Sequence, residues 1–255
     1  MARLEGKAAI ITGATGGIGE TTARIFLDEG AAVMLVGRSS EQLAAVRGRM
    51  PSGRGVELSV AEARDEAAME AAVAATIKAF GGVDILFANT GMTGSVPIEA
   101  CTQPRFEEIL LTNVVGAWLP MKHCVEPMKR RGGGSIIATA SIAGVAGIPG
   151  LAAYAASKHG VCGLVKTAAL ELATSRIRVN AIAPGPIDNR MMQVFESQTS
   201  PEDPGSVRKA FEEGIAMKRY GTNEEVGKLV TFLASDDASY CTGGIFMVDG
   251  GFAAA

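Results

Sequence analysis

Short runs of apolar, often β-branched residues alternate along the chain with longer stretches in which apolar residues recur every three or four positions. The short runs predict buried strands at residues 8–12, 33–36, 56–60, 83–87, 136–140, 179–182 and 245–248. The longer stretches predict helices, the clearest of which cover residues 17–29, 66–80, 104–128 and 152–173. Strands that alternate with helices form parallel sheets covered on both faces. We therefore expect an α/β fold, a doubly wound (Rossmann) parallel β-sheet with helices on both faces.

The chain carries neither a repeat nor a linker-like stretch, so its 255 residues are expected to form one domain, residues 1–255. One region, from Pro184 to about Gly205, lacks a firm pattern and contains several prolines. It follows a predicted strand, and open α/β sheets bind ligands at the carboxyl ends of their strands. We interpret residues 186–215 as a substrate lid, with a plain surface loop as the alternative.

The composition is that of an ordinary globular protein, with 47% hydrophobic and 20% charged residues, which excludes disordered and fibrous classes. A net charge of −3 without a long block of like charge predicts no nucleic-acid and no membrane partner. Glu5 and Lys7 stand where a secretion signal requires an apolar stretch, so a cytoplasmic location is expected. The four cysteines are widely spaced and predict reduced thiols, with no metal site.

A glycine-rich segment, Thr12–Gly19, joins the first predicted strand to the first predicted helix. The backbone N–H groups of such a loop and the positive end of the helix converge on one point, which suits a phosphate. Gly13 permits a tight turn, Gly17 the approach of a pyrophosphate, and Gly19 close packing of the helix. For the motif alone an ordinary turn is the alternative, but the flanking strand and helix favour dinucleotide binding.

The end of the second predicted strand bears on which dinucleotide is bound. Gly37 stands where an NAD enzyme usually offers a carboxylate to the ribose hydroxyls, and glycine has no side chain to do this. Arg38 and Ser39 follow, and a guanidinium matches the geometry of a 2′-phosphate. NADP(H) is therefore preferred over NAD(H), the alternative being that Arg38 is a solvated residue at a helix start.

Tyr154 and Lys158 are four residues apart at the start of a predicted helix, so both side chains lie on one face. The ammonium group favours the phenolate and is expected to lower the pKa of Tyr154 toward working pH, as a general acid and base requires. Ser141, just after a predicted strand, is placed to hold a carbonyl oxygen toward the tyrosine. Each residue alone also has an ordinary structural explanation, as does Asn113 within the predicted helix 104–128.

Together these residues resemble the short-chain dehydrogenase/reductase family, in its branch of about this chain's length. The resemblance rests on TGxxxGxG at Thr12–Gly19, on the closing Asp249-Gly250-Gly251, and on the tetrad Asn113, Ser141, Tyr154 and Lys158. It implies that Tyr154 exchanges the proton and that Ser141 orients the substrate. Lys158 would lower the tyrosine pKa and bind the nicotinamide ribose, and Asn113 would hold a water in the proton relay.

The resemblance also implies a set of cofactor contacts. They are Gly13, Thr15, Gly16, Gly17, Ile18, Gly19, Gly37, Arg38, Ser39, Glu62, Ala63, Asn89, Gly91, Tyr154, Lys158, Pro184, Gly185, Ile187 and Asn189. Glu62 replaces the aspartate usual beside the adenine, and Asn189 replaces a threonine that meets the nicotinamide carboxamide. Gly16 stands where many NADP-preferring relatives have Arg or Lys, which leaves Arg38 alone to support NADP(H).

We expect an NADP(H)-preferring oxidoreductase that interconverts a carbonyl and a secondary alcohol. The alternatives are an NAD(H)-linked alcohol dehydrogenase of the same family, a non-catalytic nucleotide-binding regulator, and epimerase or dehydratase chemistry, which is usually accompanied by TGxxGxxG. The expected substrate contacts indicate a medium-sized apolar ketone or its alcohol, and they are Ser141, Tyr154, Met92, Ala143, Ile148, Pro186, Met191, Met192 and Phe195. The resemblance further implies a homotetramer.

Overall fold

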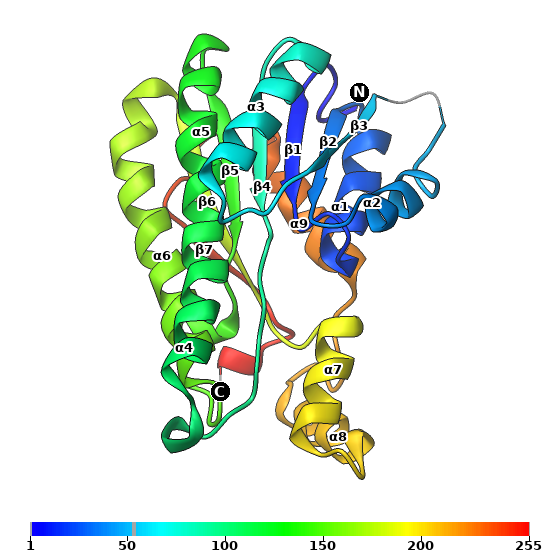
Figure 1. Ribbon diagram of the computed structural model, residues 1–255, viewed down its shortest axis with the longest axis vertical. Coiled ribbons are helices and arrows are strands. Elements are labelled where there is room, and N and C mark those ends of the chain that lie inside the picture. The colour runs from blue at the N-terminus through cyan, green and yellow to red at the C-terminus, as the bar shows by residue number, and fades with distance from the viewer. Residues whose placement is uncertain (1, 53–54, 255) are drawn as a thin grey trace.

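The computed structural model describes residues 2–52 and 55–254, and this part of the chain contains one sheet of seven parallel strands (Figure 1). The strands are β1 (Ala8–Thr12), β2 (Ala32–Gly37), β3 (Val56–Val60), β4 (Ile85–Ala88), β5 (Gly134–Thr139), β6 (Ile177–Pro184) and β7 (Ile245–Val248). Their order is β3-β2-β1-β4-β5-β6-β7, so the sheet is doubly wound about a point between β1 and β4. The predicted fold class is confirmed.

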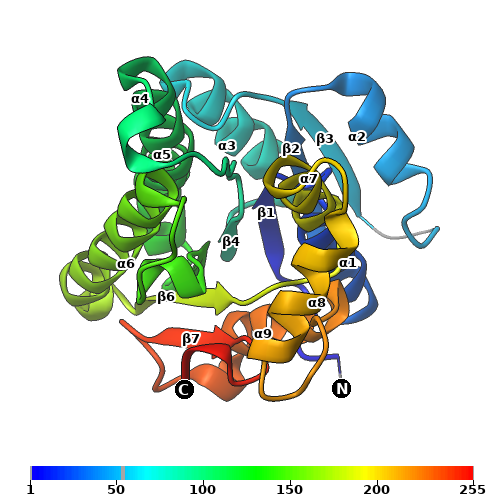
Figure 2. The same cartoon turned by 90° about the horizontal axis from the view of Figure 1, so that it is seen from below.

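Helices cover both faces of the sheet. They are α1 (Gly17–Asp28), α2 (Ser40–Arg47), α3 (Glu66–Phe80), α4 (Gln103–Leu110), α5 (Gly116–Arg130), α6 (Ala152–Leu172), α7 (Arg190–Thr199), α8 (Pro204–Gly214) and α9 (Asn223–Ala234). Helices α3, α5 and α6 pack on one face, and α1, α2 and α9 pack on the other (Figure 2). Helices α7 and α8 project beyond the carboxyl ends of the strands (Figure 1).

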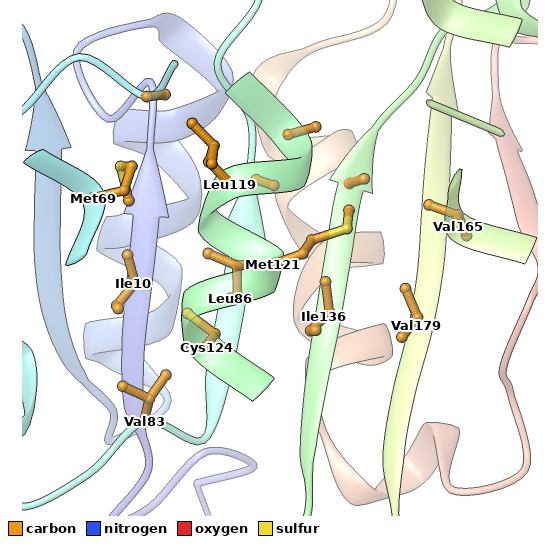
Figure 3. Packing of buried hydrophobic residues seen from close by; sticks show 14 of the residues in the cluster. Ile10, Met69, Val83, Leu86, Leu119, Met121, Cys124, Ile136, Val165 and Val179 are labelled. Carbon is orange, nitrogen blue, oxygen red and sulfur yellow. The ribbon is translucent and has the colours of Figure 1, made fainter. Parts of the chain in front are cut away.

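The strands are apolar along their whole length because successive side chains enter two different cores. Ile10 of β1 belongs to the core that contains Met69 of α3 and Cys124 of α5 (Figure 3). Its neighbour Ile11 belongs to the opposite core, with Phe26 of α1. Burial of each such large apolar side chain contributes about 1.5–3 kcal/mol to stability. The two cores therefore hold the sheet rigid beneath the loops that follow its strands.

Every predicted strand is present, with ends shifted by two residues at most. Two other regions differ from expectation. The predicted helix 104–128 is divided, because a π-helical turn, Leu111–Val115, separates α4 from α5. The region after Pro184 is not irregular but contains α7 and α8, whose first turns are capped by the side chains of Asn189 and Asp203.

The loop between β1 and α1 is shaped by two of its glycines. Gly13 has a φ of +62°, in the left-handed region that favours glycine, and a side chain there would meet the carbonyl oxygen of Asn89 at 3.0 Å. A Cβ atom on Gly19 would overlap the carbonyl oxygen of Gly13. In contrast, a Cβ atom on Gly16 would have its nearest neighbour at 3.5 Å, in ordinary contact. The tight turn at Gly13 and the close approach at Gly19 thus agree with the roles expected of them.

Substitution of Gly19 by alanine is expected to destabilise the protein, because the new methyl group meets backbone that cannot move aside. Overpacking of this kind costs about 1–3 kcal/mol. Gly16→Ala is the matched control in the same loop, with an expected cost below about 1 kcal/mol, since it changes only the first residue before the helix. Urea unfolding of both variants measures the difference, and equal midpoints would contradict this account of the loop.

Candidate active site

A cavity of about 660 Å³ lies at the carboxyl ends of the strands, within the range of known cofactor and ligand sites. The glycine loop and Arg38 line one end, and Tyr154 and Phe195 line the other. Most residues predicted for the site border it. They are Gly13, Thr15, Gly16, Gly17, Ile18, Gly37, Arg38, Glu62, Ala63, Asn89, Gly91, Met92, Ser141, Ile148, Tyr154, Lys158, Pro184, Gly185, Pro186, Ile187, Asn189, Met191, Met192 and Phe195.

Four predicted residues do not line the cavity: Gly19, Ser39, Asn113 and Ala143. Gly19 packs behind the loop against Gly13. The Ser39 hydroxyl accepts a hydrogen bond from the backbone N–H of Gln42 (3.2 Å) and caps α2. Ala143 is fully buried in a short 3₁₀ turn. Closeness to the site in the sequence therefore did not ensure that a residue reaches the cavity. These residues serve local packing or helix capping instead.

Arg38 extends from the end of β2 and is largely exposed, with 79% of its side-chain surface accessible. Its Nη1 atom lies 3.7 Å from Oε2 of Glu62, which follows β3. An exposed pair at this separation contributes little energy, so the guanidinium is free to exchange its partner. A carboxylate is thus present at this end of the cavity, but it belongs to Glu62 after the neighbouring strand β3 and not to position 37.

Tyr154 and Lys158 lie on one face of α6, and Nζ of the lysine is 5.6 Å from the centre of the tyrosine ring. Lys158 is 2% exposed, and Nζ donates a hydrogen bond to the carbonyl oxygen of Thr139 (2.7 Å). Burial lowers the pKa of Lys158 to about 8. Burial also raises the pKa of Tyr154, while the neighbouring Ser141 hydroxyl acts in the opposite direction.

The expected lowering of the tyrosine pKa by the lysine is therefore corrected. Loss of water around the phenol disfavours its charged form. The Lys158 ammonium group donates to Thr139 and lies 5.6 Å from the ring centre, where its attraction for the phenolate does not outweigh this effect. The protonated phenol is accordingly the stable form in the structure, which suits a proton donor.

Ser141 lies just after β5, directly before a short 3₁₀ turn. It is 7% exposed and lines the cavity wall. Its Oγ atom accepts a hydrogen bond from the backbone N–H of Ala143 (3.2 Å). Because a serine hydroxyl accepts and donates at once, this bond leaves its proton available for another partner. Ser141 can thus donate to an oxygen placed beside Tyr154.

Asn113 lies in the π-helical turn and is 1% exposed. Its amide accepts from the backbone N–H of Met92 (2.8 Å) and donates to the Met92 carbonyl (3.0 Å) and to Oγ of Ser157 (2.9 Å). Ser157 in turn donates to the backbone carbonyl of Tyr154 (2.7 Å). Both donors of the Asn113 amide are occupied, so the side chain positions the Met92 segment and α6, and the residue does not line the cavity.

Asn89 connects the loops that follow three strands. Its Nδ2 atom donates to the carbonyl oxygen of Gly13 (3.3 Å), and its Oδ1 atom accepts from the hydroxyl of Thr139 (2.9 Å). Its own backbone N–H donates to Oγ1 of Thr12 (3.1 Å). The glycine loop and the carbonyl that holds Lys158 are therefore joined through one side chain.

Several cavity residues escaped the sequence analysis: Thr93, Glu108, Thr112, Leu151, Val194 and Phe211. Glu108 and Thr112 are four residues apart on one helical face, and this spacing was the available signal. Phe211 lies on α8, within residues 186–215 that we interpreted as a substrate lid, but the sequence did not single it out there.

No helix of residues 2–52 and 55–254 is both long and apolar enough to cross a membrane. The same residues contain no group of three His, Cys, Asp or Glu side chains that could hold a metal ion. Cys101, Cys124, Cys162 and Cys241 are free thiols.

Comparison with known proteins agrees with this geometry. A family model described as enoyl-(acyl carrier protein) reductase matches residues 13–253. A levodione reductase from Leifsonia aquatica is 40% identical over 99% of this chain and 96% of that protein. A glucose 1-dehydrogenase from Gluconobacter oxydans is 39% identical over 98% of this chain and 92% of that protein.

The structures agree as well. A crystal structure of levodione reductase superimposes with a TM-score of 0.97 at 37% identity, covering 99% of this chain and 100% of that chain. The named relatives are oxidoreductases, which favours an enzyme over a non-catalytic regulator. The chain therefore belongs to the short-chain dehydrogenase/reductase family, and it is an oxidoreductase that acts on CH–OH and C=O groups with a nicotinamide dinucleotide.

Proposed function

We propose that this protein is an NADP(H)-preferring enzyme that interconverts an apolar ketone and its secondary alcohol, with Tyr154 as the acid and base. The observation that carries the proposal is the convergence of Ser141, Tyr154 and Lys158 on one end of a cavity that begins at the glycine loop. A cavity that joins a phosphate-binding loop to a proton donor is what a dinucleotide-dependent oxidoreductase requires.

The residues present fit a nicotinamide dinucleotide. Helix α1 begins at Gly17 with no side-chain cap, so its first N–H groups remain available to an anion such as a pyrophosphate. Gly16 places no side chain beside them. Lys158 and Asn189 would hold the nicotinamide end, and Asn89 and Glu62 the adenosine end. When bound, the cofactor supplies or accepts the hydride.

The chain's own residues carry the proton. In reduction, the Tyr154 hydroxyl donates its proton to the carbonyl oxygen as that oxygen gains negative charge, and in oxidation the phenolate takes the proton back. Ser141 donates a hydrogen bond to the same oxygen and so fixes the carbonyl against the phenol. The Lys158 ammonium group, 5.6 Å from the ring, stabilises the phenolate that forms.

Support for NADP(H) comes from the end of β2. Gly37 offers no carboxylate to a ribose, and Arg38 stands exposed at the rim of the cavity in a loose ion pair. A guanidinium forms paired hydrogen bonds with a phosphate and would exchange Glu62 for it. Ser39, whose hydroxyl caps α2, takes no part in this proposal.

One observation favours NAD(H) as a second candidate. Glu62 lies within 3.7 Å of Arg38, so its negative charge competes with a 2′-phosphate for the same guanidinium. If the Arg38–Glu62 ion pair persists when the cofactor binds, a 2′-phosphate adds little to the binding free energy. The ratio of the affinities for NADPH and NADH distinguishes the NADP(H) candidate from the NAD(H) candidate.

The substrate end of the cavity supports an apolar ketone of medium size. Ile148, Leu151, Met192 and Phe195 are among the apolar residues that line the cavity, which also has polar lining residues such as Thr93, Glu108 and Thr112. Helices α7 and α8, which span most of residues 186–215, form one wall and project from the sheet (Figure 1). We infer that this segment is the substrate lid.

We also infer a homotetramer, as the family resemblance implies. Large apolar side chains are exposed on the helices expected to meet other copies: Trp118 is 42% exposed on α5, and Leu170 is 84% exposed on α6. On strand β7 at the sheet edge, Met247 is 39% exposed. Exposed apolar groups of this size are typical of contact surfaces.

Replacement of Tyr154 by phenylalanine should lower kcat by about 10²–10⁴-fold, because it removes the proton donor and little volume. The dissociation constant for NADPH should stay within about two-fold of the wild-type value, since the ring remains. Tyr240→Phe, at a fully exposed tyrosine, is the matched control and should be unchanged. Steady-state kinetics and fluorescence titration measure both quantities, and near-normal turnover by Tyr154→Phe would refute the assignment.

Wild-type protein is expected to bind NADPH at least about ten-fold more tightly than NADH, a difference of about 1.4 kcal/mol. Arg38→Ala should remove this preference, and Glu62→Gln should increase it, because Arg38 loses its competitor. Arg47→Ala, which removes an exposed arginine from α2 outside the cavity, is the control. Calorimetry gives the ratios, and equal affinities in the wild type would favour the NAD(H) candidate.

Light scattering of the purified protein should report a mass four times that of the chain. Leu170→Asp should shift the protein toward smaller species, since it places a charge in the inferred contact. A wild-type monomer at micromolar concentration would refute the tetramer.

A further inference from the structure

Phe211, on α8, separates two hollows in the molecule. One side of the residue lines the cavity that contains Tyr154. Its other side lines a second, more open hollow of about 540 Å³, bordered by Val207 and Gly214 of α8 and by Phe252 near the C-terminus. Phe211 is the one residue that borders both hollows in the described part of the chain.

The ring of Phe211 is held between two other aromatic rings. On the cavity side it packs edge-on against Phe195 of α7, with ring centres 5.9 Å apart and planes at 65°. On the outer side it lies against Phe252, with centres 6.0 Å apart and planes at 35°. Each such pair contributes about 0.5–1.5 kcal/mol beyond its burial. Phe252 does not itself line the cavity with Tyr154, so it can influence that cavity only through Phe211.

Phe252 occupies the side toward which the Phe211 ring would otherwise turn. The ring of Phe252 packs close to the end of α8, because a Cβ atom on Gly214 would lie 3.4 Å from it. Beyond this contact the second hollow offers free space. Removal of the Phe252 ring would therefore let Phe211 move outward, and removal of the Phe211 ring would join the two hollows.

We propose that Phe211 sets the upper size limit of the substrate, and that Phe252 is a positioning residue that keeps the Phe211 ring in place. The proposal rests on the proposed function, since it assumes that the ketone occupies the cavity beside Tyr154. It assigns substrate selectivity to α8 and to the C-terminal segment, more than fifty residues beyond Tyr154 in the sequence. The substrate class that follows is an apolar ketone whose size is limited by Phe211.

The test compares cyclohexanone with 4-phenylcyclohexanone, using the ratio of their kcat/KM values with NADPH. Phe211→Ala should raise the ratio in favour of the larger ketone by at least about ten-fold, because the two hollows join. Phe252→Ala should raise it by about three-fold, because Phe211 can then turn outward. The double variant should match Phe211→Ala alone, since Phe252 acts only through that ring.

Three controls separate the outcomes. Phe106→Ala removes a partly exposed phenylalanine from α4 that borders neither hollow, and it should leave the ratio unchanged. Phe211→Leu retains an apolar side chain and the fold, and it should give an intermediate ratio if Phe211→Ala proves unstable. Fluorescence titration should show unchanged NADPH affinity in all variants.

A wild-type enzyme inactive on both ketones would refute the proposed function. An active wild type with an unchanged ratio in Phe211→Ala would refute only the size limit. Additive effects of the two alanine substitutions would refute the positioning role of Phe252.

Discussion

The amide of Asn89 joins the carboxyl ends of three neighbouring strands, and the active-site geometry depends on this connection. It holds the glycine loop after β1 through the Gly13 carbonyl and the end of β5 through the Thr139 hydroxyl. The carbonyl of the same Thr139 receives the Lys158 ammonium group. The proposed phosphate site and the proposed proton donor thus share one reference point on a rigid sheet. Catalysis needs reacting groups placed to within a fraction of an ångström, which such a shared anchor supplies.

Burial governs the chemistry at the other end of the cavity. Loss of water keeps Tyr154 protonated and brings the pKa of Lys158 to about 8, so the two groups titrate further apart than they would in water. Asn113 and Ser157 fix the backbone of Tyr154 without touching the cavity. The tetrad therefore divides into groups that face a substrate and one, Asn113, that holds them in place. This division depends on the π-helical turn, which the helical periodicity of the sequence did not reveal.

Much of this arrangement could be predicted from the sequence, for identifiable reasons. The strands were recognisable because both faces of the sheet are buried, and the glycine loop because backbone contacts exclude any side chain at Gly13 and Gly19. Helices α7 and α8 were missed because prolines and polar caps at their ends obscured a short helical period. Phe211 was missed with them. Ala143 and Ser39 show a further limit, since position after a strand does not determine where a side chain points.

The most direct test of the account is the rate of NADPH oxidation by the wild-type protein with a panel of apolar cyclic and linear ketones. The account predicts oxidation that depends on the ketone and forms one secondary alcohol for each NADPH consumed. Tight NADPH binding without turnover of any ketone, and without oxidation of the corresponding alcohols by NADP⁺, would contradict it.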